Sequence, residues 1–433
     1  MAERLPTAPP RGMRDVLPDE VELRDAATQA IVRVYRSHGF RRIETPALES
    51  LRLLLGSDGG ENEKLIFKVL KRGEDLEAAL AGGGRELADL GLRFDLTVPL
   101  ARYYAENHAR LPDPLKAIQI GPVWRAERPQ KGRYRQFTQC DIDVLGVGSI
   151  VSEVELILAT CEALAGLGLT GLAVRVNDRR LLGLIARHCG FTDDRQASFF
   201  IAFDKLDKVG AEGVLGDLRE AGHEAAAIVR FEALLPVLQK REMSLESLAQ
   251  ALRAAGEPAA FESLASILRI VAPELPDGAR VEFDPTLVRG MGYYTGTIFE
   301  IVSPSFPSSI AGGGRYDRMV GRLLGRDVPA CGFSIGFERL IAILGEREGA
   351  RVTLLPAREG ARRIALLLED EAALAGALSA ARALRAKGDL VSLELRRKNT
   401  RKQLDDLKAH GFSDYATLEG GAPAVVKPLR QTG

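Results

Sequence analysis

The residues from Gly121 to Gly146 have the types that bind phosphate groups. A short strand ending near Arg125 is followed by a polar loop, and the chain returns in the strand-like stretch RQFTQCDIDVLG. Guanidinium groups on such a hairpin suit a triphosphate, because they stay charged and meet oxygen atoms in a planar fork. The alternative is a solvated basic loop between two strands. The charged and polar residues concerned are Arg125, Glu127, Arg128, Lys131, Arg133, Arg135, Gln139 and Asp143.

A second cluster, LVRGMGYYTGTIFE at 287–300, combines glycines with aromatic side chains. Gly290 and Gly292 allow a backbone to approach a ligand closely, and Tyr293 and Tyr294 have the size to wall a pocket. The alternative is a pair of core aromatic residues beside a strand turn.

Two shorter stretches add glycine-rich turns and one charged pair. AGGGRYD, at 311–317, is by itself the signature of an ordinary turn or bulge. GFSIGFERL, at 332–340, predicts a strand that leads into a helix opening with Glu338 and Arg339. Taken singly, that pair is compatible with an ordinary charged pair on a helix.

The histidines and cysteines do not have the positions or spacing of catalytic or metal-binding residues. The five histidines lie outside these clusters, which argues against a histidine-based nucleophilic triad. The cysteines, Cys140, Cys161, Cys189 and Cys331, have no metal-ligand spacing, so we expect free buried thiols and no metal site. Arginine, carboxylate, tyrosine and glycine fit a phosphate reaction that depends on positioning and charge stabilisation.

Periodic patterns indicate the elements that must hold these residues. Apolar residues at helical spacing predict a helix over 19–40 that stops at Gly39. In RQFTQCDIDVLG, strict alternation puts Gln139, Asp141 and Asp143 on one face of a strand, since successive side chains point to opposite faces.

In the second half of the chain the predicted secondary structure changes twice. Residues 178–272 read as a run of helices, with Asn177 or Asp178 and Ser244 as helix caps. Strand patterns return after this run, and the stretch GEREGARVTLLPAREGA has the composition of a linker. The last segment alternates strands and helices, which predicts a small α/β domain with a partly parallel sheet.

Length, charge and hydropathy limit the classes of protein. With 433 residues the chain needs two or three domains. Its 59 basic and 59 acidic residues balance, so a nucleic-acid partner would require a local basic patch. We find no secretory signal and no apolar run long enough to span a membrane, which together predict a cytoplasmic protein.

Taken together and in this order, the stretches resemble the class II aminoacyl-tRNA synthetases in their histidyl form, the histidyl-tRNA synthetase family. GFRRIETPALE resembles motif 1, GPVWRAERPQKGRYRQFTQCDID motif 2 and GFSIGFERL motif 3. LVRGMGYY and AGGGRYD resemble the two stretches peculiar to the histidyl enzymes, and PPRGMRDVLP and LRFDLTVPLARY also match. The similarity covers nearly the whole chain.

The resemblance implies an α+β fold: an antiparallel sheet of six to seven strands flanked by helices, assembled as a homodimer. The implied divisions are a catalytic core over 1–177 and 273–345, a helical insertion over 178–272, a linker over 346–360 and an anticodon-binding-like α/β domain over 361–433. The implied activity is that of a histidine–tRNA ligase. It uses ATP with Mg²⁺ to form histidyl-adenylate, releases pyrophosphate, and then loads the 3′ end of tRNA(His).

The resemblance also assigns roles to individual residues. Arg125 and Arg289 would be catalytic, one at the α-phosphate and the other the arginine specific to histidyl enzymes. ATP would be bound by Arg125, Glu127, Arg133 and Arg339. Histidine would be bound by Asp95, Thr97, Gln139, Asp143, Arg289, Tyr293 and Tyr294. A basic run in the last domain would contact tRNA, although a solvated face is an equal alternative: Arg396, Arg397, Lys398, Arg401 and Lys402.

Several positions depart from the family pattern, and a rival function remains. Asp95 and Asp143 stand where many bacterial members have glutamate, and Gly292 and Gly296 replace a common aspartate and arginine, as in the eukaryotic-like branch. The rival is a non-catalytic paralogue that serves as the regulatory subunit of ATP phosphoribosyltransferase. Such paralogues usually lack the anticodon domain and have a degraded histidyl-specific stretch, whereas Arg289 and both tyrosines are present in this chain.

Overall fold

The computed structural model describes residues 7–56, 61–83, 86–128, 134–240, 243–252, 258–289, 292–346, 362–410, 412–418 and 425–429. Arg133 and all but the first residue of the predicted linker, 346–360, lie outside these ranges. No described helix is both long enough and apolar enough to cross a membrane.

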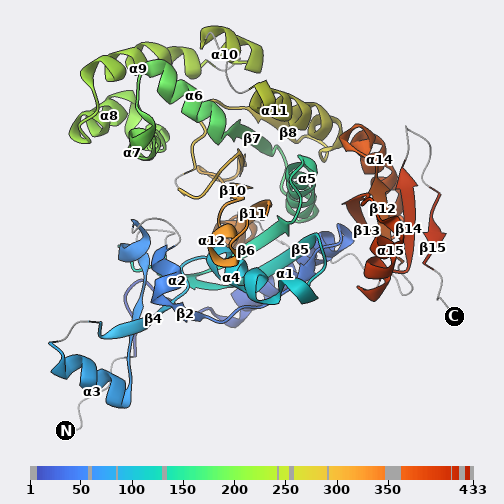
Figure 1. Ribbon diagram of the computed structural model, residues 1–433, viewed down its shortest axis with the longest axis horizontal. Coiled ribbons are helices and arrows are strands. Elements are labelled where there is room, and N and C mark those ends of the chain that lie inside the picture. The colour runs from blue at the N-terminus through green and yellow to red at the C-terminus, as the bar shows by residue number, and fades with distance from the viewer. Residues whose placement is uncertain are drawn as a thin grey trace.

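A mixed sheet forms the centre of the molecule (Figure 1). Within the described residues it contains eight strands in the order β1-β5-β6-β11-β10-β9-β7-β8. Their bounds are β1 (Arg41–Arg42), β5 (Leu115–Trp124), β6 (Gln136–Leu145), β11 (Ala330–Gly336), β10 (Ala311–Arg315), β9 (Thr297–Val302), β7 (Ala173–Asp178) and β8 (Arg280–Phe283).

The α+β class and a sheet flanked by helices are confirmed, but a purely antiparallel sheet of six to seven strands was wrong. The pairings from β5 to β7 are antiparallel, whereas β1 pairs with β5 and β8 with β7 in parallel. Parallel neighbours need a crossover between them, and both edge pairs are separated by long stretches of chain. The helices α6–α11 provide the crossover from β7 to β8.

Three helices pack together against the main sheet. They are α1 (Pro18–Ser37), α5 (Val151–Gly166) and α13 (Phe337–Gly345), and α1 contacts both of the others. Helix α5 is buried around most of its circumference because it lies between the sheet, α1 and α11. The four cysteines are free and buried, as predicted.

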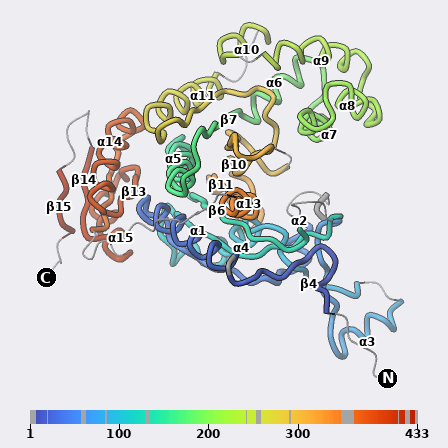
Figure 2. Tube along the Cα trace, turned by 180° about the vertical axis from the view of Figure 1, so that it is seen from behind, coloured from blue at the N-terminus to red at the C-terminus, as the bar shows by residue number. Residues whose placement is uncertain are grey.

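Helices fill the chain between β7 and β8 (Figures 1 and 2). Asp178 caps the first of them by accepting from the backbone of Arg180, and Ser244 caps α10 by accepting from Ser247, so both predicted caps are confirmed. The helices are α6 (Arg179–Cys189), α7 (Gln196–Phe203), α8 (Leu206–Glu220), α9 (Ala225–Leu238), α10 (Leu245–Ala251) and α11 (Pro258–Val271). Their core is a ring cluster of Phe191, Phe199, Phe203 and Phe231.

A small arm projects from the other side of the main sheet, at the end opposite the C-terminal unit in Figure 1. Its three described strands pair antiparallel in the order β2-β4-β3. Four leucines of the arm, Leu48, Leu70, Leu80 and Leu90, are exposed. Its elements are β2 (Leu48–Ser50), α2 (Leu51–Gly56), β3 (Lys68–Leu70), α3 (Gly73–Ala81) and β4 (Ala88–Leu92), and α4 (Thr97–Asn107) follows it. The short α12 (Gly321–Leu324) packs against α4.

The C-terminal unit is a separate sheet with two helices, shown in red in Figure 1. Strands β13, β12 and β14 pair in parallel, and β15 pairs antiparallel with β14, in agreement with the predicted partly parallel sheet. The elements are β12 (Arg363–Leu368), α14 (Leu374–Arg385), β13 (Leu390–Leu395), α15 (Thr400–Ala409), β14 (Asp414–Leu418) and β15 (Lys427–Pro428).

A buried lysine fastens this unit to the main sheet. The ammonium of Lys116, on β5, donates to the carboxylate of Glu155 at 3.0 Å, the hydroxyl of Ser392 at 2.8 Å and the carbonyl of Leu393 at 2.7 Å. Lys116 and Glu155 are almost fully buried. An ion pair removed from water in this way is stable only while all of its partners remain in place.

Candidate functional site

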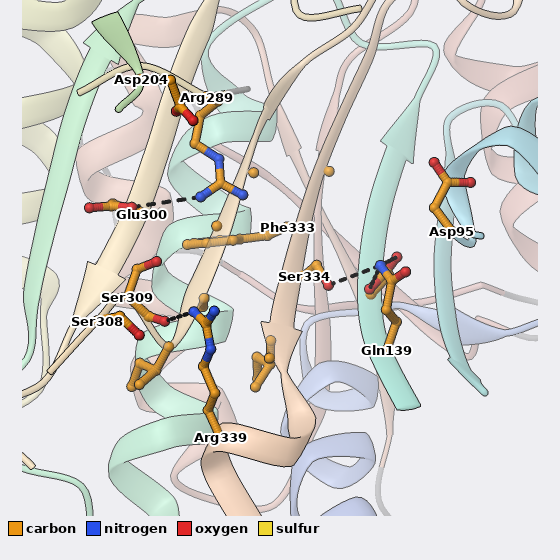
Figure 3. A pocket seen from close by; sticks show the side chains of 18 of the residues that line it. Asp95, Gln139, Asp204, Arg289, Glu300, Ser308, Ser309, Phe333, Ser334 and Arg339 are labelled. Atoms are coloured by element: carbon orange, nitrogen blue, oxygen red, sulfur yellow. Dashed lines mark hydrogen bonds and ion pairs between the residues drawn. The ribbon is translucent and has the colours of Figure 1, made fainter. Parts of the chain in front are cut away.

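A large cavity lies over the centre of the main sheet. It has a volume of about 1590 Å³ and is lined by residues from β6, β10 and β11, by residues between Asp284 and Arg289, by Tyr293 and Tyr294, and by the corner between α7 and α8. Single small-molecule pockets usually measure about 300–1,000 Å³, so this cavity has room for two substrates side by side. Figure 3 shows its polar side chains pointing into the open space from opposite walls.

Strand β6 forms the acidic wall. Gln139, Asp141 and Asp143 face the cavity, while Cys140 and Ile142 are fully buried on the opposite face. The alternation predicted from the sequence is therefore confirmed. Gln139 also donates to Asp141 at 3.2 Å.

A neighbouring segment brings two more predicted residues to this wall. Asp95 and Thr97 follow β4 and are buried, and both line the cavity. One carboxylate oxygen of Asp95 accepts from the backbone nitrogen of Val98 at 3.1 Å, which fixes the carboxyl group at the start of α4.

Asp143 is held by a tyrosine that our sequence analysis did not assign. The hydroxyl of Tyr316 donates to its Oδ1 at 2.5 Å. Burial, with the nearby Asp141 second, raises the pKa of Asp143 well above its usual range. A side chain built at Gly332, opposite Asp143 on β11, would lie 2.0 Å from that same Oδ1, so only glycine fits there.

Arg289 lines the cavity on the wall opposite the acidic wall of β6. Its guanidinium lies 3.6 Å from the carboxylate of Glu300 on β9, and Asp204 of the α7–α8 corner stands beside it (Figure 3). A side chain at Gly312 would come within 2.4 Å of the guanidinium, so the glycine of β10 provides the passage. Tyr293 and Tyr294 follow, with ring centres 4.8 Å apart, and both line the cavity.

Arg125 and Glu127 line the cavity just beyond the end of β5. The Nε of Arg125 donates to the carbonyl of Phe94 at 3.0 Å, and its guanidinium lies over the ring of Phe137 at 5.1 Å. These contacts leave the terminal nitrogens directed to the cavity side of the strand end. Arg133 belongs to the stretch outside the described residues.

Arg339, in the first turn of α13, closes one end of the cavity. It donates to the carbonyl of Ser309, and Ser308 lies next to it in Figure 3. The preceding Glu338 is bound by Arg24 of α1 at 2.7 Å and by the backbone of Thr138 at 3.1 Å. These bonds hold the start of α13 against the acidic wall.

The segment before α1 supports the same end of the cavity. Arg14 pairs with Glu20 at 2.5 Å and with Glu338 at 3.3 Å, and its guanidinium lies 4.9 Å from the ring centre of Tyr134. The carbonyl of Gly12 accepts from the backbone of Arg135 at 2.7 Å. The segment therefore connects α1, α13 and the returning half of the arginine-rich hairpin.

The basic run of the C-terminal unit does not line the cavity. Arg396 pairs with Glu369, and Arg397 pairs with Asp406 at 3.1 Å. Lys398, Arg401 and Lys402 are exposed. Their predicted contact with tRNA stays a prediction.

Buried polar atoms facing the cavity lack partners among the described residues. They are Oε1 of Gln139, Oδ2 of Asp143 and Nε of Arg289. Buried polar groups in native proteins are nearly always hydrogen-bonded, so these atoms mark where a polar ligand would bind. Among the residues that the structure describes, no group of three or more histidine, cysteine or acidic side chains has the arrangement of a metal site.

Sequence reasoning did not assign several polar residues that line the cavity, among them Asp141, Asp204, Glu300, Tyr316 and Ser334. Asp141 could have been found, because it shares a strand face with Gln139 and Asp143. The others gave no local signal, since they meet the cavity only through strand pairing or through the α7–α8 corner.

Comparison with known proteins gives a consistent result. A family model described as Histidyl-tRNA synthetase matches residues 12–340. The chain is 46% identical to a histidine–tRNA ligase of Leifsonia xyli, over 98% of this chain and 99% of that protein. It is 42% identical to a histidine–tRNA ligase of Aeropyrum pernix, over 77% of this chain and 73% of that protein.

Solved structures share the fold along the whole chain. The crystal structure of a histidyl-tRNA synthetase from Nostoc sp. PCC 7120 is similar with a TM-score of 0.65 and 26% identity, covering 98% of this chain and 95% of that one. A Bacillus halodurans protein titled as an ATP phosphoribosyltransferase regulatory subunit/histidyl-tRNA synthetase has a TM-score of 0.66, covering 97% and 100%. At 22% identity the latter likeness concerns the fold alone.

Proposed function

Because this chain belongs to the histidyl-tRNA synthetase family, we propose that it is a histidine–tRNA ligase that works in the cavity over its main sheet. It activates histidine with ATP and transfers the histidyl group to tRNA. The observation that carries the assignment of the site is the set of unpartnered buried polar atoms of Gln139, Asp143 and Arg289, which face one cavity from opposite walls.

The arginines would divide the cavity into a nucleotide end and an amino-acid end. Arg125, Glu127, Arg133 and Arg339 would bind ATP, as the motifs imply, and Mg²⁺ bound to ATP would screen the leaving pyrophosphate. Asp95, Thr97 and Gln139 would hold the amino group of histidine. Asp143 and Tyr294 would bond the ring nitrogens, and Tyr293 would wall the pocket.

The first step is attack of the histidine carboxylate on the α-phosphorus of ATP. A new P–O bond forms, the bond to the pyrophosphate oxygen breaks, and negative charge grows on the non-bridging oxygens. Arg125 follows β5 and Arg289 passes over β10, with β6 and β11 between them. Three strand spacings are about 14 Å, a span that two arginine side chains can close around one phosphate. Both guanidiniums would then stabilise the transition state.

The second step uses the tRNA. A ribose hydroxyl at its 3′ end attacks the carbonyl carbon of the adenylate, the bond to the phosphate breaks, and AMP leaves. We propose the domain division given by the sequence, with 178–272 as an insertion and 361–433 as the anticodon-binding-like domain. In this scheme the basic run from Arg396 to Lys402 contacts the tRNA.

Two further properties belong to the proposal. We propose that the chain is a homodimer, as its resemblance to the family implies. Sedimentation of the purified chain measures its mass in solution.

We expect a cytoplasmic location, where the product is used.

Histidine-dependent exchange of labelled pyrophosphate into ATP tests the function. We expect exchange with histidine and with none of the other amino acids, followed by charging of tRNA(His). A folded protein that supports exchange with no amino acid would leave the regulatory-subunit reading as the better account. Exchange with a different amino acid would assign the chain another specificity.

Replacing Asp143 should weaken histidine binding and spare ATP binding. Leaving the buried partner of a lost hydrogen bond unsatisfied costs about 1–3 kcal/mol, so we expect D143N to raise KM for histidine about 5- to 100-fold. KM for ATP should stay within about twofold of the wild-type value, because the lost bond is made to histidine at the amino-acid end of the cavity and not to ATP. Tyr316→Phe, which removes only the bond that orients Asp143, should give a smaller rise. Equal increases in both KM values would contradict the assignment.

Arg14 should affect the nucleotide end, although it lies outside the cavity. R14Q removes the contacts with Glu20, Glu338 and Tyr134, which loosens the base of the arginine hairpin. We expect KM for ATP to rise about three- to tenfold with little change for histidine, because misplaced groups lose binding energy at their own end. Arg36→Gln, at an exposed position of α1, is the matched control. A change confined to KM for histidine would refute this role.

A further inference from the structure

The acidic wall contains one more carboxyl group than the proposed binding of histidine requires. Asp95, Asp141 and Asp143 are all 2–3% exposed and line the same cavity. In the proposed function, Asp95 serves the amino group and Asp143 the imidazole ring. Asp141 lies between them on the wall and has no assigned partner on the substrate.

The groups packed around Asp141 supply little positive charge. Ser334 faces it from β11 and Gln119 from β5. On its own strand Gln139 donates to it at 3.2 Å and 3.4 Å. The buried thiol of Cys140 and the phenol of Tyr35 lie toward the core behind it, and neither carries charge at neutral pH.

Two arginines are near enough to act on Asp141, but both have other bonds. Arg125 donates to the carbonyl of Phe94. Arg93 donates to the carbonyls of Thr45 at 2.7 Å and Pro122 at 3.0 Å. Burial raises the pKa of Asp141 to about 7, with the hydrogen bond from Ser334 opposing the rise and the charge of Asp95 adding to it.

The amino group of a bound histidine would lie beside Asp141. Gln139, one proposed holder of that group, donates to Asp141, and Asp95, the other, is close enough for its charge to act on Asp141. Figure 3 shows Asp95 and Gln139 on the same side of the cavity, with Ser334 across from Gln139. An ammonium placed between Asp95 and Gln139 would therefore come to rest against a third oxygen-bearing side chain.

We propose that near neutral pH Asp141 is protonated in about half of the histidine-free molecules and releases that proton to solvent when the histidine ammonium binds, so that the carboxylate holds the ammonium with Asp95. The inference rests on the proposed function and adds a proton-linked positioning residue to it. The O–H bond of Asp141 breaks, the proton passes to water, and the ammonium keeps its three hydrogens.

The sign of the linkage follows from the two states. A nearby cation favours the ionised carboxyl group, so binding lowers the proton affinity of Asp141. Near pH 7 about half a proton should leave per histidine bound, rising toward about one proton near pH 6 and falling to about zero near pH 9. Histidine binding should thus weaken as the pH falls through about 7, because the proton competes with the ammonium.

Calorimetric titration of the full chain with L-histidine tests the proposal. Repeating it in buffers of different ionisation enthalpy gives the number of protons released. We expect the wild-type protein to release about half a proton more than D141N near pH 7, and the difference to vanish near pH 9. Subtracting the variant removes the contribution of the substrate imidazole, which both proteins share. The pKa of Asp143 is raised by burial and also by the charge of Asp141, so the same subtraction is repeated in a D143N background, which has no carboxyl group at that position.

Separate controls identify each kind of failure. D141S removes the same carboxyl group with less bulk and takes the place of D141N if that variant does not fold. Equal proton release by wild type and variant, with histidine-dependent exchange intact, would overturn the role of Asp141 alone. Absence of histidine-dependent exchange in the wild type would overturn the proposed function itself. A uniform rise in KM for histidine with an unchanged pH profile would show that Asp141 is only structural.

Discussion

Arg289→Ala should lower the rate of histidine-dependent pyrophosphate exchange by about 10²- to 10³-fold, the usual effect of removing one donor aimed at transition-state charge. The loss should appear mainly in kcat, because the charge on the α-phosphate oxygens grows only as the bond forms. R289K should recover part of the rate, since an ammonium restores the charge without the planar fork.

The environment of Arg289 makes this variant a fair test. Removing its guanidinium leaves Glu300 with a second arginine, Arg175, at 3.7 Å, so no carboxylate loses its last partner. Arg280→Ala, at the exposed first position of β8, is the matched control and should retain full activity. Near-normal exchange by R289A would exclude Arg289 from the chemistry.

Lys116→Ala should cause a large loss of stability. It leaves the carboxylate of Glu155 buried without its cation, and breaking a buried ion pair from one side costs about 3–5 kcal/mol. The bonds to Ser392 and Leu393 disappear with it, so the packing of the C-terminal unit against β5 should loosen, while its contacts through Glu371, Arg382 and Arg385 remain. Chemical denaturation, with limited proteolysis of the C-terminal unit, measures both effects.

A pair of variants separates the charge from the packing. K116M/E155L removes both charges and keeps most of the volume, so it should be clearly more stable than K116A. Lys398→Ala removes an exposed lysine of the C-terminal unit and should change stability little. Equal stability of K116A and wild type would show that the buried pair does not hold the two parts together.

Local patterns were sufficient for the elements that carry the site. The alternation in β6 placed Gln139, Asp141 and Asp143 on one face, because the period of a strand is fixed by its geometry. Ser244 and Asp178 were recognisable as caps, since an accepting side chain at that position satisfies backbone donors of the first turn. The motifs indicated Arg125, Arg289 and Arg339 through resemblance.

Contacts between distant segments could not be predicted from the sequence. Tyr316 meets Asp143 only because β11 lies between β10 and β6, and no pattern within AGGGRYD specifies that order. Asp204 reaches the cavity at the corner between α7 and α8. The spacing of apolar residues in these helices indicates only how the helices pack against each other, so it does not point to the cavity. The parallel edges of the main sheet likewise depend on crossovers whose path a single sequence does not reveal.

The glycines of β10 and β11 have a consequence for attempts to make the enzyme accept other amino acids. Around Asp143 and Arg289 the boundary of the cavity is main chain, at Gly332 and Gly312, and contains no side chain that could be trimmed. A bulkier amino-acid analogue cannot be admitted by substitution at those two places. Among the described residues, the aromatic side chains of Tyr293, Tyr294 and Tyr316 can be shortened to make room, so a mutant library directed at new substrates should begin with them.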